Sequence, residues 1–227
     1  MDNSIFPIVI VSHNRLNLTI ECLDSLFVNT EIPFHAVLVD NGSDEDIQAK
    51  LCEYMTFRNH ESEHLLSLVL FNYNCGIAQA RNFGILGLRA TNPSPLIGIF
   101  DNDIRFKPGW LPTALSVMEA KPRLGIFGCC FGSHPPKIPF TLNGRNYVTK
   151  ANQPGHSWIV RTSLFDEVGM FDPNYGFRAD GTRYGFCDGQ FVSRVRASTD
   201  YVIACPTPEF DLVEHMGQSD ITHKPKP

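Results

Sequence analysis

Two aspartates one residue apart, Asp101 and Asp103, directly follow an apolar run of the sequence. The run, residues 96–100, is typical of a buried strand, and in open α/β sheets ligands bind beyond the carboxyl ends of the strands. Two carboxylates there could hold a hard divalent cation, which prefers oxygen ligands and is often shared with substrate phosphates. An Asp-x-Asp tripeptide can equally be a solvated turn, so its interpretation depends on the rest of the chain.

Polar segments also follow two earlier strand-like runs. Residues 12–15 (Ser-His-Asn-Arg) come after the run 6–11, and residues 40–43 (Asp-Asn-Gly-Ser) come after the run 36–39. The carboxyl ends of parallel strands share one edge, so these segments and 101–103 predict a crevice with one arginine and several acids. Such a crevice suits a nucleotide, because a carboxylate can accept from a base N–H while a cation or arginine neutralises phosphates.

The motifs of several competing site classes are missing. No Gly-x-Gly-x-x-Gly follows the first strand, and no Gly-x-x-x-x-Gly-Lys or Gly-x-Ser-x-Gly occurs anywhere. A dinucleotide site, a phosphate-binding P-loop and a serine-hydrolase elbow are therefore disfavoured. A phosphatase that uses Asp101 as its nucleophile remains an alternative, because such enzymes also carry Asp-x-Asp after a strand.

The elements that must position these residues alternate between strand and helix. Helical patterns at 16–28, from 43 towards 57 and at 77–88 separate the strand-like runs, which predicts an α/β fold with a mainly parallel sheet and helices on both faces. The pattern then changes. We expect a helix at 108–119, a strand at 124–131, a proline-rich loop at 133–139, short strands within 147–160, a long loop at 172–188, a helix at 190–197 and a strand at 201–204.

Composition limits the partners and the compartment. The 227 residues are 43% hydrophobic, enough for a sizeable core, and 19 basic against 24 acidic residues give a net charge of −5 with no basic block. An extended nucleic-acid surface is therefore not supported. The seven cysteines are odd in number and form no Cys-x-x-Cys, which favours a reducing compartment and disfavours a cysteine-bound zinc. Without a basic leader or a long apolar run, the chain is predicted to be soluble and cytoplasmic.

Several segments together resemble the family 2 glycosyltransferases of the GT-A fold. They are residues 9–14, 37–43, 74–82 and 100–103, followed by Val168-Gly169-Met170-Phe171-Asp172 in the manner of that family's Gly-Gly-Phe-Asp segment. Cys187-Asp188 occupies the place of its Glu-Asp pair, and His215-Met216-Gly217 that of its late histidine. Cys187 departs from the family's glutamate, and the Gln-x-x-Arg-Trp signature of processive synthases is absent.

The resemblance implies one GT-A (Rossmann-like) domain across residues 1–227. Residues 1–103 would bind the nucleotide-sugar, residues 104–217 would bind the acceptor, and 218–227 would form a flexible tail. The activity implied is inverting, metal-dependent transfer of one sugar from a nucleotide diphosphate sugar, most simply a UDP-sugar, to the hydroxyl of a glycan or another acceptor. The net charge disfavours a nucleic-acid acceptor. A non-catalytic relative that only binds nucleotide-sugars is a further alternative.

The resemblance also implies roles for individual residues. Asp40 would bind the nucleobase, and Ser12, His13 and Arg15 would line the base and diphosphate. Arg81 would lie near the diphosphate or its anchoring acids, and Asp101 and Asn102 would contact the nucleotide-sugar. Asp103 would ligate Mn²⁺ or Mg²⁺, and His215 would be a further metal ligand or a diphosphate contact. Asp188 would be the general base. These roles match the chemistry, because sugar transfer needs a neutralised leaving group and a carboxylate to deprotonate the acceptor.

Overall fold

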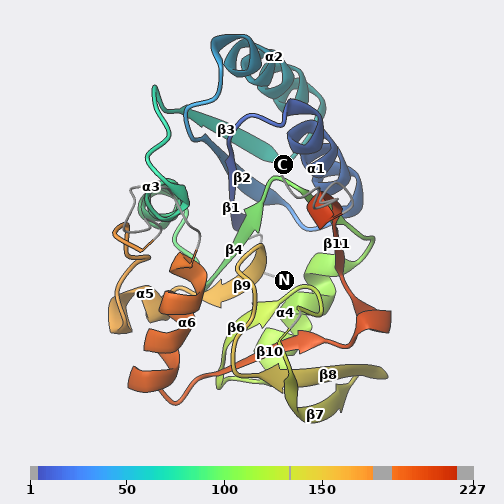
Figure 1. The fold of residues 1–227 in the computed structure, drawn as a ribbon. Coiled ribbons are helices and arrows are strands. Elements are labelled where there is room, and N and C mark those ends of the chain that lie inside the picture. Colours follow the sequence, from blue (N-terminus) through green and yellow to red (C-terminus); the bar gives the residue numbers. More distant parts are fainter. Residues whose placement is uncertain (1–4, 133, 176–185, 219–227) are drawn as a thin grey trace, which may run out of the picture.

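The computed structural model describes residues 5–132, 134–175 and 186–218 (Figure 1). In the first half, strands and helices alternate as the sequence predicts. The elements are β1 (Phe6–Ser12), α1 (Leu16–Asn29), β2 (Phe34–Asp40), α2 (Glu45–Glu61), β3 (Leu65–Leu70), α3 (Ile77–Thr91) and β4 (Leu96–Asp101).

The second half is more varied. It comprises β5 (Ile104–Phe106), α4 (Trp110–Ala120), β6 (Leu124–Gly128), β7 (Pro136–Leu142), β8 (Arg145–Lys150), β9 (Ser157–Arg161), α5 (Ser163–Glu167), α6 (Cys187–Ser198), β10 (Val202–Pro206), β11 (Val213–His215) and two short 3₁₀ turns, Pro208–Phe210 and Met216–Gln218. Within the described ranges, no helix combines the length and the hydropathy that crossing a bilayer requires.

Nine strands form one mixed sheet in the order β3-β2-β1-β4-β9-β6-β10-β8-β7. Strands β1 to β4 run parallel, whereas β9 is antiparallel to both of its neighbours, β4 and β6. In register, Ser12 lies opposite Asp40 and Val11 lies opposite Asp101. The three polar segments predicted to share an edge of the sheet therefore do so.

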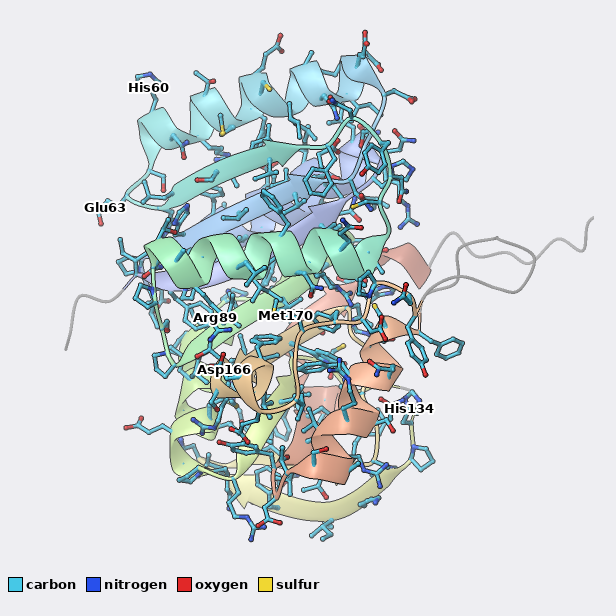
Figure 2. The ribbon with its side chains drawn as sticks, turned by 90° about the vertical axis from the view of Figure 1, so that its left-hand side faces the viewer. His60, Glu63, Arg89, His134, Asp166 and Met170 are labelled. Atoms are coloured by element: carbon cyan, nitrogen blue, oxygen red, sulfur yellow. The ribbon has the colours of Figure 1, made fainter. Side chains whose placement is uncertain are left out.

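Helices cover both faces of the sheet. Successive side chains of a strand point to opposite faces, so neighbouring residues pack in different cores. Ile8 and Ile10 pack in the core beneath α1 and α4, and Val9 and Val11 pack in the core beneath α3, α5 and α6. On the second face, Arg89 of α3 donates to both carboxylate oxygens of Asp166 on α5 at 2.7 Å (Figure 2). This exposed pair contributes little by itself, but it marks where the two helices meet.

A separate two-stranded ribbon, β5 with β11, carries the end of the described chain back to the crevice. The strands are antiparallel, with His215 opposite Ile104, and Met216 N donates to Asp103 O at 2.8 Å. His215 is thereby fixed beside Asp103 although the two are far apart in sequence. Neither strand is predicted from the sequence, since three residues are too few to show a period.

The proline-rich segment 133–139 differs from its prediction as a loop. Strand β7 begins at Pro136 and pairs with β8 through a turn at Asn143 and Gly144, whose φ angles are +50° and +72°. The prolines are tolerated because β7 is the outermost strand and needs fewer ladder donors. The long loop at 172–188 falls partly, and the tail at 218–227 almost wholly, outside the described residues, and α6 begins earlier than predicted, at Cys187.

Helix α3 lies close to the sheet at Gly84 but not at Gly87. Alanine substitutions at these two glycines therefore form a matched pair that tests the packing of the helix. A Cβ at Gly84 would lie 2.7 Å from Val9 Cγ1, whereas a Cβ at Gly87 would meet nothing within 4 Å. We expect Gly84→Ala to lower the free energy of unfolding by about 1–3 kcal/mol through overpacking. Gly87→Ala should raise it by about 0.5–1 kcal/mol through helix propensity. Urea denaturation of both variants checks this, and equal stabilities would contradict the packing described.

Candidate functional site

A buried arginine connects three elements at the carboxyl edge of the sheet. Arg81 of α3 is 2% exposed, and its Nη2 donates to Asp101 Oδ1 at 2.6 Å and to Gly155 O at 2.8 Å. Burial, the largest single effect, lowers the pKa of Arg81, but Asp101 together with Cys187 and Asp188 outweighs burial and raises it. The guanidinium therefore stays charged and ties α3 to the end of β4 and to the turn before β9.

The same turn holds Asp188, at the first turn of α6. Gly155 N donates to Asp188 Oδ2 at 2.8 Å, so Gly155 contacts Arg81 through its carbonyl and Asp188 through its amide. A Cβ at Gly155 would lie 2.5 Å from Asp188 Cβ, so only glycine permits this approach. A pocket of about 230 Å³ opens here, and its lining includes Arg81, Asp101, Gly155, His156, Asp188 and His215.

Asp103 is the centre of a second group of charges. Arg15 Nη1 lies 2.9 Å from Asp103 Oδ2, and His215 Nε2 lies 3.3 Å from Oδ1. Burial would raise the pKa of Asp103, but His215 and Arg15 together lower it below its ordinary value. The contact with Asp103 in turn raises the pKa of His215. The group is therefore an ionised carboxylate between the guanidinium of Arg15 and the imidazole of His215.

Asp103 and His215 fit a divalent cation that is shared with a substrate. Oδ1 of Asp103 is buried and has no hydrogen-bond partner, and it faces the imidazole of His215. Among the described residues no group of three or more His, Cys, Asp or Glu side chains is suited to hold a metal. A site with two protein ligands agrees with the habit of Mg²⁺-type ions, which take one or two carboxylates and complete their shell with phosphate and water.

The loop between β1 and α1 has a strained backbone that orients Arg15. Asn14 and Arg15 both have φ near +55°, a left-handed conformation that costs non-glycine residues about 1–2 kcal/mol each. Asn14 N donates to Ser43 Oγ at 2.7 Å, and Asp44 N donates to Asn14 Oδ1 at 3.2 Å. These contacts with the loop after β2 offset the strain and direct the Arg15 side chain towards Asp103.

Asp40 is wholly buried and already engaged with its own chain. Its carboxylate accepts from Ser12 Oγ at 3.1 Å, from Ser43 N at 3.0 Å, from Ser43 Oγ, and from Gln48 Nε2 at 2.9 Å. A carboxylate offers about four lone-pair sites, so these donors fill it. Contact of Asp40 or Ser12 with a nucleobase stays a prediction, and it requires one of these donors to move aside.

Two other predicted nucleotide-sugar ligands lie differently. Asn102 is 7% exposed and donates from Nδ2 to Thr19 Oγ1 of α1 at 2.7 Å, away from the pocket. The side chain anchors α1 to the turn after β4, and its contact with a nucleotide-sugar stays a prediction. His13 is exposed at the end of β1, and its contact with a nucleotide stays a prediction.

Sequence reasoning missed His156, which lines the pocket. Its ring centroid lies 4.7 Å from that of His215, and its carbonyl accepts from Asp101 N at 2.9 Å. Burial, followed by the charge of His215, lowers the pKa of His156. The Pro154-Gly155 turn directly before an apolar strand is the signal that could have located this wall. Cys187 lies there too, with Sγ 3.9 Å from Arg81 Nη1.

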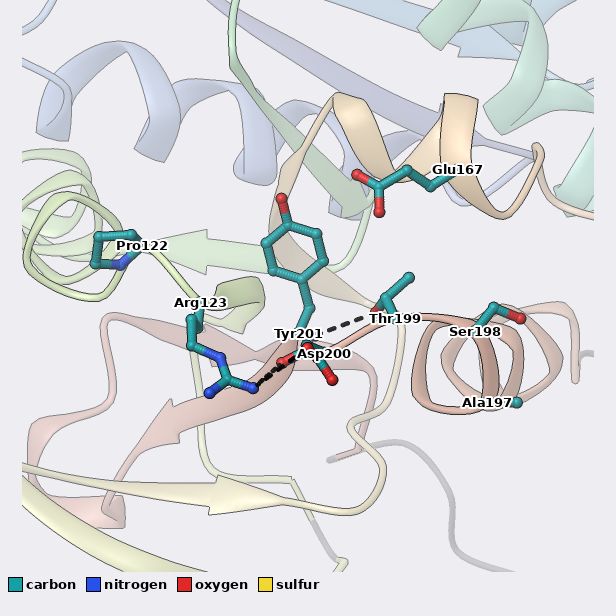
Figure 3. Close-up of a pocket in the computed structure, with 8 residues that line it drawn as sticks. All are labelled: Pro122, Arg123, Glu167, Ala197, Ser198, Thr199, Asp200 and Tyr201. Atoms are coloured by element: carbon teal, nitrogen blue, oxygen red, sulfur yellow. Dashed lines mark hydrogen bonds and ion pairs between the residues drawn. The ribbon is translucent and has the colours of Figure 1, made fainter.

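A wider hollow of about 820 Å³ lies away from these residues (Figure 3). Pro122, Arg123, Glu167 and residues 197–201 line it, just before β6 and β10 begin. Both strands run in the same direction as β1, so the hollow is at the opposite edge of the sheet. Its size does not make it the candidate site, because none of the clustered charges faces it.

The hydrogen bonds of Asp40 predict a structural effect that is separate from any ligand. Asp40→Ala strands a buried Ser12 hydroxyl and three further donors, so we expect the free energy of unfolding to fall by about 2–4 kcal/mol. Asp44→Ala is the control, because Asp44 is exposed and makes no side-chain cap, and it should change stability by less than about 0.5 kcal/mol. Chemical denaturation measures the free energy of unfolding of both variants. Equal values for Asp40→Ala and Asp44→Ala would contradict the structural role of Asp40.

Comparison with known proteins places this geometry in a family. The model of glycosyl transferase family 2 matches residues 8–184, more than half of the chain. An uncharacterized glycosyltransferase of Haemophilus influenzae is 25% identical over 162 residues, which are 71% of this chain and 49% of that protein. The chain thus spans about half the length of this curated relative.

Solved structures agree in fold. The structure of GalNAc-T7 with UDP, GalNAc and Mn²⁺ has a TM-score of 0.67 at 14% identity and covers 91% of this chain and 44% of its own. The mannosyltransferase PcManGT from Pyrobaculum calidifontis, in complex with GDP-Man and Mn²⁺, has a TM-score of 0.64 at 15% identity. The match covers 91% of this chain and 58% of that protein's chain. The fold is therefore GT-A, and the chain belongs to glycosyl transferase family 2.

Proposed function

We propose that this glycosyltransferase moves one sugar from a UDP-sugar to an acceptor hydroxyl by a single inverting displacement that depends on a divalent cation. The observation that carries the proposal is the position of Gly155 between Arg81 and Asp188. It holds a candidate base and a charge-neutralising arginine at one small pocket. The UDP and Mn²⁺ in the structure of GalNAc-T7 support this choice of donor and ion, and the Mn²⁺ that accompanies GDP-Man in PcManGT supports the ion.

Asp188 is the proposed base. The amide of Gly155 fixes Oδ2 at 2.8 Å, which leaves Oδ1 to accept a proton from an acceptor hydroxyl in the pocket. During attack, the acceptor oxygen forms a bond to the anomeric carbon while the bond from that carbon to the diphosphate oxygen breaks. The electron pair leaves with the diphosphate, and the acceptor proton passes to Asp188. One displacement of this kind inverts the anomeric carbon.

A second group of residues would stabilise the departing diphosphate. Arg15 and Arg81 bring positive charge to the crevice, and their contacts with Asp103 and Asp101 hold the two guanidinium groups in place. Asp103 and His215 would hold the divalent cation, which when bound neutralises the departing diphosphate as a Lewis acid. Asp101 is held at 2.6 Å by Arg81, so its engagement favours an anchoring role over that of a nucleophile in a phosphatase.

Replacing the base separates catalysis from binding. We expect Asp188→Asn to lower the rate of UDP release from UDP-sugars by about 10²–10⁴-fold, because the amide cannot take the proton. The affinity for UDP should stay within about twofold, since an amide oxygen can still accept from Gly155 N. Asp200→Asn is the control, because Asp200 is 98% exposed at the distant hollow. A variant that keeps full turnover would exclude Asp188 as the base, and no turnover in either form would favour a non-catalytic binding protein.

Replacing the proposed metal ligand tests the cation without an activity measurement. Asp103→Asn keeps the shape of the side chain but removes its charge. The factor by which Mn²⁺ raises the affinity for UDP should therefore be smaller than in the wild type by about tenfold or more. Thermal unfolding with UDP, with and without Mn²⁺, measures this. Asp166→Asn, on the far helix α5, should behave as the wild type. An unchanged Mn²⁺ effect in Asp103→Asn would place the ion elsewhere.

A further inference from the structure

A second pocket, of about 490 Å³, adjoins the candidate site. It shares Pro154, His156 and His215 with the smaller pocket, and the rest of its lining includes Lys107, Phe131 and Asp211. The two pockets therefore adjoin along these shared residues. A ligand in the second pocket would lie next to the smaller pocket that Asp188 lines.

Asp211 is held rigidly in this second pocket. Phe131 N donates to Asp211 Oδ1 at 2.6 Å, Lys107 Nζ donates to Asp211 O at 3.0 Å, and the next residue, Leu212, donates from N to Cys129 O at 2.8 Å. Among the described residues no donor reaches Asp211 Oδ2. The side chain is half-buried, so one preorganised acceptor oxygen remains for a ligand.

The charges around this pocket nearly cancel. Lys107 and the nearby buried Lys150, which lies over the ring of Phe131, are cations beside Asp211. Glu214 is paired with Arg105 at 2.7 Å, and Arg105 also pairs with Glu21, so three cations meet three acids. An anionic ligand would need an excess of positive charge that this pocket does not have. A neutral polyol matches it, because hydroxyl groups can donate to Asp211 and accept from Lys107.

We propose that this second pocket binds the acceptor, and that the acceptor is a neutral sugar whose hydroxyl donates to Asp211 Oδ2. This inference rests on the proposed function and adds the class of acceptor to it. Asp211 and Lys107 are then specificity-determining residues, since they hold the acceptor sugar while Asp188 takes its proton. The volume of the pocket is in the range of ordinary small-molecule sites, about 300–1,000 Å³.

The test uses methyl glycosides of glucose, galactose and N-acetylglucosamine as neutral probes, with glucuronic acid and glucose 6-phosphate as anionic counterparts. Release of UDP from a UDP-sugar is measured in water and with each probe, and mass spectrometry detects the new glycoside. We expect at least one neutral probe to accelerate UDP release at least tenfold more than either anion. Asp211→Asn and Lys107→Met should each raise the KM for that probe at least tenfold, and Asp200→Asn should not.

The outcomes separate the two claims. Donor turnover in water with no acceleration by any neutral probe overturns the inference and leaves the proposed function standing. A preference for the anionic probes, or an unchanged acceptor KM in both Asp211→Asn and Lys107→Met, also overturns it. No turnover of any donor, with or without a probe, overturns the proposed function and the inference with it. Lys107 is exposed, so its variant keeps the test informative if Asp211→Asn fails to fold.

Discussion

The ion pair between Arg81 and Asp101 is the interaction on which the rest of the site depends. A guanidinium that is almost fully buried must be paired and hydrogen-bonded, because an isolated charge there would cost several kcal/mol, on the order of 3–5 when one partner is removed. Nη2 of Arg81 takes its hydrogen-bond partners from two different segments, the end of β4 and the turn at Gly155. The need to satisfy one buried cation therefore brings together the segments that form the pocket.

A division of labour follows from this constraint. On one side, the amide of Gly155 holds Asp188 at the start of α6, where a carboxylate is also favoured by the helix dipole. On the other side, the β5–β11 ribbon brings His215 to Asp103, and the strained turn after β1 brings Arg15. The carboxylates are thus in different environments: Asp103 and Asp101 face cations, whereas Asp188 accepts from a neutral backbone amide. Groups that could neutralise a departing diphosphate and a carboxylate that could accept a proton therefore lie close together.

The sequence was sufficient for the first half of the fold and for much of the site. Apolar runs followed by polar residues predicted β1, β2 and β4 and their shared edge, because parallel strands buried on both faces leave a continuous apolar signal. Arg81, Asp101, Asp188 and His215 line one pocket, and their roles stay predictions. The sequence could not show that β5 pairs with β11, since pairing between distant three-residue strands leaves no periodic pattern. It also could not show that Asp40 is saturated by its own chain or that Asn102 turns towards Thr19, because side-chain partners depend on packing.

In the proposed reaction, the base and the leaving group act on opposite sides of the sugar in one displacement. The anomeric configuration of the product tests this most directly, by proton NMR of the free sugar that a UDP-α-sugar releases when water is the acceptor, recorded before the sugar mutarotates. We expect the β-anomer to form first. Initial formation of the α-anomer would show retention and would contradict the single displacement assigned to Asp188.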